Sequence, residues 1–94
     1  MNFGKAVKAL KKGHKIARDS WQASGKWLAL STGNTNMPAD EFWNKHAKKF
    51  AQGNNGEAEV LSYIILKTTD DKIRMGWTAN SEEILAEDWL ILED

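Results

Sequence analysis

The chain has 94 residues, of which 41% are hydrophobic and 28% are charged, and it contains no cysteine. This length accommodates one domain, which we expect to span residues 1–94, and the composition is typical of a globular protein. The lack of cysteine excludes disulfides, thiolate zinc sites, iron–sulfur clusters and a cysteine nucleophile. The longest nearly apolar run, residues 60–66, is far shorter than the roughly 20 residues that span a bilayer, so we expect no membrane partner.

The formal net charge is zero, but the two ends of the chain carry opposite charge. Residues 1–20 contain six basic side chains and one acid, whereas residues 81–94 contain six acids and no base. Such polarity can steer an anionic ligand to the basic segment, attract the ends of one or two subunits to each other, or simply form two solvated faces. The balanced total argues against a general nucleic-acid binder, because nonspecific affinity grows with the number of phosphates neutralised.

Five tryptophans are more than a core of this size needs. We expect two or three of them to pack inside, and the others to contact a flat ligand or another subunit, where tryptophan is enriched.

A helix is predicted over residues 3–12, because apolar side chains recur at i, i+3, i+4 and i+7 from Phe3. Asn2 supplies the cap at its start, and Gly13 the left-handed stop at its end.

Two strands of a hairpin follow, over residues 14–18 and 26–31, with a turn between them. Residues 31–40 are predicted to form a loop.

A second helix is predicted to begin at Pro38 or Asp40 and to end near Gln52. His46 lies at helical spacing from Phe42 and Phe50, so we expect it to be a partly buried core residue. Residues 53–56 are a linker.

Residues 61–68 are predicted to form a central strand covered on both faces, which turns back into residues 73–77. Asn80 and Glu83 have the spacing of a capping box, so a short helical turn is expected there, with Ile84 and Leu85 facing inward. Residues 89–92 are predicted to form a closing edge strand.

These elements predict an α+β fold: a small antiparallel β-sheet with an N-terminal helix, an inserted second helix and a short C-terminal helical turn. The expected sheet has two antiparallel pairs plus one edge strand.

Few side chains favour catalysis. His14 and His46 lack metal-ligand spacing, the adjacent Glu87 and Asp88 do not converge on a helix, and residues 53–56 lack the context of a phosphate loop. We therefore expect no catalytic residue, no metal and no cofactor.

A binding site is the better reading of the remaining side chains. Arg18, Trp21 and Trp77 lie near strand ends, where a ring can stack on a base and a guanidinium can bind a phosphate.

The segments MNFGKAVKALKKGHKIARDSW, MPADEFW, GEAEVLSYIILKT, MGW and ILAEDW, in this order, resemble the phage family called Thoeris anti-defence two. The resemblance covers essentially the whole chain. It implies a sponge, not an enzyme, that sequesters a cyclic nucleotide second messenger of the glycocyclic ADP-ribose type in the cytoplasm of the infected bacterium. It also implies that some members bind cyclic oligonucleotides, and that the family forms homotetramers with pockets at subunit interfaces.

The resemblance assigns ligand binding to eight positions, which are Phe3, Gly4, Arg18, Trp21, Trp77, Ala79, Asn80 and Asp88. Structural roles are the alternatives: Phe3 in the core, and Arg18 paired with Asp88. We assign Trp89 to packing. Trp21 follows a strand in a turn that offers little core, so its ring is expected to stack on a base and its removal to leave stability nearly intact. Two other functions remain open, a small DNA- or RNA-binding phage protein and a structural oligomerisation module.

Overall fold

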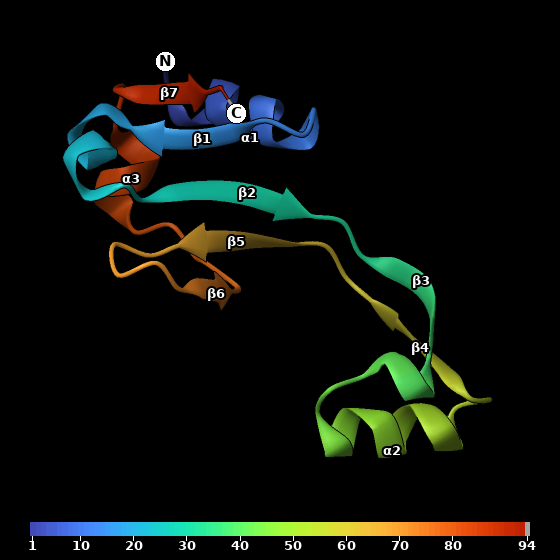
Figure 1. The fold of residues 1–94 in the computed structure, drawn as a ribbon. Helices are drawn as coiled ribbons and strands as arrows, with labels where there is room; N and C mark the ends of the chain where they lie inside the picture. Colours follow the sequence, from blue (N-terminus) through green and yellow to red (C-terminus); the bar gives the residue numbers. More distant parts are fainter. Residues whose placement is uncertain (94) are drawn as a thin grey trace. The chain divides into compact units, whose positions relative to one another are not determined.

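The computed structural model describes residues 1–93, which divide into two compact units, residues 1–31 with 63–93, and residues 32–62 (Figure 1). The first unit contains, in chain order, α1 (Phe3–Lys11), β1 (Lys15–Arg18), the 3-10 helix η1 (Asp19–Ser24), β2 (Trp27–Ser31), β5 (Tyr63–Lys67), β6 (Ile73–Met75), α3 (Ser81–Leu85) and β7 (Trp89–Leu92). The second contains β3 (Asn34–Pro38), the 3-10 helix η2 (Ala39–Glu41), α2 (Lys45–Gly53) and β4 (Glu57–Val60).

Helices and a mainly antiparallel sheet confirm the predicted α+β class. The first unit has one five-stranded sheet in the order β6-β5-β2-β1-β7, and every neighbouring pair is antiparallel. Both predicted pairs occur, β1 with β2 and β5 with β6, and β7 is an edge strand as expected. In Figure 1, α1 lies beside β1 and β7, at the edge of the sheet that β7 forms.

Helix α1 forms for the local reasons that the sequence indicates. The side chain of Asn2 accepts a hydrogen bond from the backbone N–H of Lys5 at 2.9 Å, which satisfies one of the free amides of the first turn. Gly13 has φ +93°, a left-handed conformation that most other residues avoid. The helix packs Ala6 and Leu10 into the core.

The core of the first unit is formed by α1, β1, β2, β7 and η1. Its largest fully buried side chains are Trp89, Ile16 and Leu28. Ile16 pairs with Leu28 on one side and with Ile91 on the other, so these side chains project to the same face of the sheet. Trp89 lies at the centre of the core, which confirms its assignment to packing.

Strand β5 is second in the sheet and not central, because β2 occupies the middle position. The side chains of β5 are half-buried throughout, so the predicted double cover is wrong. A continuous apolar run does not by itself show which faces of a strand are covered.

The predicted loop at residues 31–40 contains β3, which pairs with β4 in a two-stranded sheet. Neither strand was predicted: β3 lacks the alternation that marks a half-buried strand, whereas Glu57–Val60 alternates between polar and apolar residues and was missed. Both belong to the second unit.

The second helix begins later than predicted. Pro38 leads into η2, Phe42 is extended, and α2 starts at Lys45. Asn44 causes this late start, because its side chain accepts hydrogen bonds from the backbone N–H groups of His46 and Ala47.

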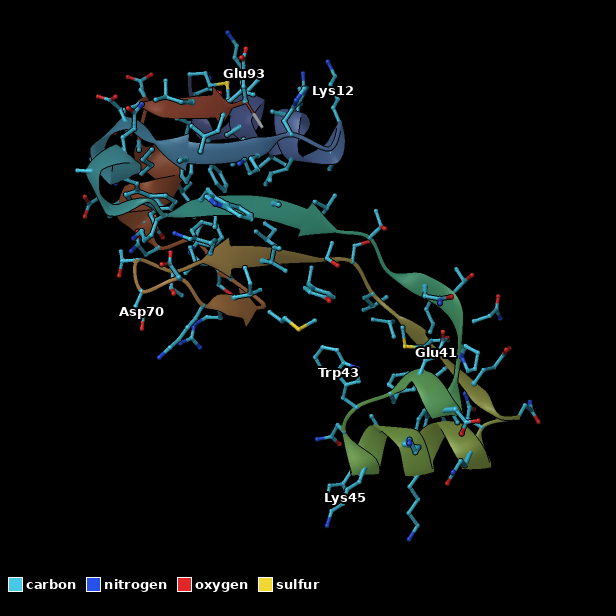
Figure 2. The ribbon with its side chains drawn as sticks, viewed as in Figure 1. Lys12, Glu41, Trp43, Lys45, Asp70 and Glu93 are labelled. Carbon is cyan, nitrogen blue, oxygen red and sulfur yellow. The ribbon has the colours of Figure 1, made fainter. Side chains whose placement is uncertain are left out.

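The predicted burial along α2 is wrong. His46 is exposed and Phe50 is 64% exposed, while Ala51 is the buried residue of the helix. Trp43, which precedes α2, is 93% exposed, and Figure 2 shows its ring projecting from the chain.

The capping box at α3 is confirmed. The Asn80 side chain accepts from the N–H of Glu83, and the Glu83 carboxylate accepts from the N–H of Asn80, both at 2.8 Å. The expected inner face is absent, because Ile84 and Leu85 are 49% and 77% exposed.

Candidate functional site

Most of the predicted site residues gather at the end of the sheet where β1 ends and β7 begins. Arg18 is the last residue of β1 and pairs with Trp89, the first residue of β7. Trp21 lies in η1, which follows β1 directly, and Trp77 follows β6. The site is therefore assembled from segments that lie far apart in the sequence.

An ion pair ties two of these segments together. The Arg18 Nε donates to Asp88 Oδ1 at 2.8 Å, and the backbone N–H of Ser20 donates to Asp88 Oδ2 at 3.4 Å. The Arg18 Nη1 also lies 3.5 Å from the Glu82 carboxylate. Asp88 thus fixes both the guanidinium and the start of η1, which bears out the structural alternative for Arg18.

The pair changes the pKa of both partners. The hydrogen bond from Arg18 lowers the pKa of the Asp88 carboxyl, and the same hydrogen bond raises the pKa of Arg18. Asp88 is therefore ionised at neutral pH and holds the guanidinium in one orientation.

Three aromatic rings pack around Trp89. The centroids of Phe3, Trp21 and Trp77 lie 5.5, 5.2 and 6.5 Å from the Trp89 ring, and Trp21 and Trp77 also meet edge to face at 6.4 Å. Edge-to-face contact is the favoured geometry for such rings. The Trp89 indole N–H donates to the carbonyl of Glu83 at 2.9 Å, which anchors α3 to the cluster.

The sequence suggested that Trp21 lies in an open turn, but the structure buries it. Only 7% of it is exposed, because η1 folds back and packs the ring against both Trp89 and Trp77. The Lys26 ammonium covers the ring at 4.3 Å from its centroid. Trp77 is half-buried, so of the three tryptophans in the cluster it is the one best placed to meet a ligand.

The remaining predicted residues differ in their settings. Phe3 packs on the core cluster, as its structural alternative proposed. Asn80 is exposed and caps α3, Ala79 is half-buried beside it, and Gly4 is exposed in the first turn of α1. Their part in ligand binding stays a prediction.

Two contributors were missed at the sequence level. Glu82 is a second carboxylate for Arg18, and Lys26 lies over Trp21. Neither has a sequence signal that points to these contacts. Glu82 reaches Arg18 only because α3 lies near the end of β1, and Lys26 reaches Trp21 through the way the chain turns after η1.

Within residues 1–93, no group of three or more His, Asp or Glu side chains is placed to hold a metal ion. No helix in the same part of the chain is long and apolar enough to cross a membrane.

The fold and this site define a small α+β protein in which an aromatic cluster and an ion pair lie at one end of an antiparallel sheet. The family model described as the Thoeris anti-defense 2-like domain matches residues 1–92. A curated relative, Thoeris anti-defense 2 of Bacillus phage SP01, is 33% identical over 93 residues, which cover 98% of this chain and 94% of that protein.

The chain therefore belongs to the Thoeris anti-defense 2-like family, as its motifs suggested. Membership of this family indicates a phage protein that acts against bacterial defence.

Proposed function

We propose that this protein binds and sequesters a cyclic nucleotide immune signal of the glycocyclic ADP-ribose type, and that it does not degrade the signal. The observation that carries the proposal is the half-buried Trp77, which makes edge-to-face contacts with the buried Trp21 and Trp89. The Arg18–Asp88 ion pair lies at the same end of the sheet, and the chain belongs to an anti-defence family.

Each feature has a part in the proposed binding. The open part of the Trp77 ring offers a stacking surface for a purine. Asp88 engages the Arg18 Nε and Glu82 lies near Nη1, so the Nη2 group is the part of the guanidinium that suits a phosphate oxygen. Gly4, in the first turn of α1, gives a phosphate close access to the positive end of that helix.

The buried residues have a positioning role in this proposal. Trp21 and Phe3 fix Trp89 and Trp77 and so hold the stacking surface still, while Asp88 orients Arg18. Asn80 and Ala79 form the approach beside α3, where the Asn80 side chain is already committed to its capping bond. A rigid site needs no ordering of side chains on binding, which favours tight capture.

Sequestration requires a stable complex without turnover, and we propose that the protein is not an enzyme. We further propose that it assembles as a homo-oligomer, with a tetramer as the expected state, and that it works in the cytoplasm of the infected host. Trp27 is half-buried and lies outside the cluster around Trp89, so it is a tryptophan that can serve such an assembly.

The proposal is tested by titrating the protein with a glycocyclic ADP-ribose in a calorimeter. Trp77→Ala is expected to weaken binding by roughly 5- to 150-fold, the loss of one base–aromatic stack. Trp43→Ala is the matched control, because it removes a tryptophan that is 93% exposed in the other compact unit. Equal affinity of Trp77→Ala and the unchanged protein would contradict the assigned site.

Turnover is tested on the loaded complex. Heat denaturation should release the nucleotide unchanged, as judged by mass spectrometry. A hydrolysed product formed faster than in a protein-free sample would show an enzyme instead. Binding of polynucleotides that falls steeply with salt would favour the nucleic-acid-binding alternative.

A further inference from the structure

A shallow groove of about 240 Å³ lies alongside α1 in the first unit. Its lining residues are Lys5, Lys8, Ala9, Lys12, His14 and Ile91. Ala9 and Ile91 give it an apolar floor, and its other four side chains are three lysines and one histidine. Among residues 1–93, no acidic side chain lines it.

The three lysines of the groove are not neutralised within the described chain. The ion pairs among residues 1–93 use Arg18, Lys67 and Lys72, and none of them involves Lys5, Lys8 or Lys12. Residues at i, i+3 and i+7 share one face of a helix, so the three ammonium groups project to the same side. Like charges at this spacing repel one another unless an anion lies between them.

Helix stability does not explain this arrangement. Lys8 is in the last turn of α1, where a cation interacts favourably with the helix dipole. Lys5 is in the first turn, where the dipole disfavours a cation, and that turn contains no acid to offset it. Lys5 is therefore not placed there by helix stability.

A second hollow, beside the turn between β5 and β6, is a useful comparison. It also has two basic residues, Lys72 and Arg74, but Asp70 lines it as well and pairs with Lys72 at 3.1 Å. The hollow beside β6 thus contains its own counter-charge, whereas the described residues supply none to the groove along α1.

We propose that the α1 groove is a second anion site, which binds linked phosphates such as a di- or triphosphate. Lys5 and Lys12 are seven residues apart, about 10 Å along the helix, which is longer than a single phosphate ion and suits several in a row. Lysines bind phosphate as point charges and adapt to its position. Figure 2 shows the Lys12 side chain extending from the end of α1.

The groove is separate from the tryptophan cluster. Phe3, which packs on Trp89, is about 160° around the helix from Lys5, at 100° per residue. A ligand in the groove therefore does not need the Trp77 ring, and this proposal does not rest on the proposed function.

The probe for the test is inorganic tripolyphosphate, titrated into the full chain in a calorimeter at low and at physiological salt. One site per chain is expected. The triple variant K5Q/K8Q/K12Q should bind at least about tenfold more weakly, since each charge-assisted contact contributes about that factor. The matched control is K45Q/K48Q/K49Q, which removes three positive charges from α2.

Affinity that falls equally in both triple variants would overturn the proposal, because general electrostatic attraction then explains the binding. Absence of tripolyphosphate binding to the unchanged protein would overturn it as well. Melting temperatures establish that both variants fold, and His14→Gln, outside α1, provides a second test that leaves the helix intact. Its affinity should fall in the same direction as that of the triple variant, and an unchanged affinity would remove His14 from the site.

Two further arms identify the source of the phosphates and the independence of the site. The first experiment titrates a short single-stranded DNA. If the DNA binds more tightly than tripolyphosphate and loses affinity only in K5Q/K8Q/K12Q, the groove binds a nucleic-acid backbone. If the DNA binds more weakly, a free polyphosphate is favoured. Trp77→Ala should bind tripolyphosphate normally. Loss of tripolyphosphate binding in Trp77→Ala would overturn a separate site, whereas loss of cyclic nucleotide binding alone concerns only the proposed function.

Discussion

Trp21 meets Trp89 edge to face, with ring centroids 5.2 Å apart and an interplanar angle of 79°. The two residues come from η1 and β7, which are adjacent because β1 and β7 pair along their full length. Trp89 is fully buried and Trp21 nearly so. This contact makes Trp21 part of the core and changes what its removal should do.

Trp21→Ala is expected to destabilise the protein by roughly 3–5 kcal/mol, because it leaves a cavity against Trp89 and Trp77. The free energy of unfolding, measured by denaturant titration, checks this value. Trp43→Ala is the control and should change stability by less than about 0.5 kcal/mol, since that ring is 93% exposed. A Trp21→Ala protein as stable as the unchanged chain would restore the ring to the list of ligand-stacking residues.

The Arg18–Asp88 pair should make stability depend on pH in the acid range. The pKa of Asp88 is lowered from its ordinary value of 3.8, so the unfolded chain takes up the proton more readily than the folded one. The stabilisation from this group is therefore present above that value and is lost as the pH falls through the lower folded pKa.

Asp88→Asn tests this dependence. Its melting temperature should lie below that of the unchanged protein at neutral pH, and the difference should narrow as the pH falls below the ordinary value of 3.8. Asp40→Asn is the control, because Asp40 is exposed and its side chain makes no hydrogen bond or ion pair within residues 1–93. A difference that stays constant down to strong acid would mean that the carboxylate charge does not stabilise the fold.

Asn80→Ala should cost about 0.5–2 kcal/mol, because it removes the acceptor for the Glu83 N–H at the start of α3. Loss of the α3 turn would also affect the Glu83 carbonyl, which accepts from the Trp89 indole. Asn80→Ser keeps a capping oxygen and should recover most of the loss. Thermal melts of the two variants separate capping from any other role of Asn80, and equal destabilisation by both would contradict the capping explanation.

Gly33→Ala should destabilise the second unit. A Cβ at this position would collide with the Val60 carbonyl oxygen and lie 2.9 Å from the backbone of Leu61 and Ser62. Backbone atoms in a strand connection cannot move aside as a side chain can. Gly53→Ala is the matched control, because nothing lies within 4 Å of a Cβ there. Hydrogen exchange in β3 and β4 should increase in Gly33→Ala and stay unchanged in Gly53→Ala.

Much of the fold could be predicted from the sequence because the deciding interactions are local. Asn2 and Gly13 bound α1 through contacts within a few residues, and the Asn80–Glu83 box spans three positions. The alternation in residues 14–18 and 26–31 predicted β1 and β2 for the same reason. In the second unit local signals competed, and the side chain of Asn44 started α2 later than helical periodicity indicated.

The sequence by itself determined the α+β class, the positions of α1, α3 and most strands, and the family. The candidate residues were named from the sequence, but which of them meet and which are buried depends on the tertiary structure. Arg18 and Asp88 are 70 positions apart in the chain, and Trp21 became a core residue only because η1 folds onto β7. Periodicity and capping report on neighbours within one or two turns of chain, whereas burial and ion pairing across a sheet depend on which strands become adjacent, and that is settled only when the whole sheet forms.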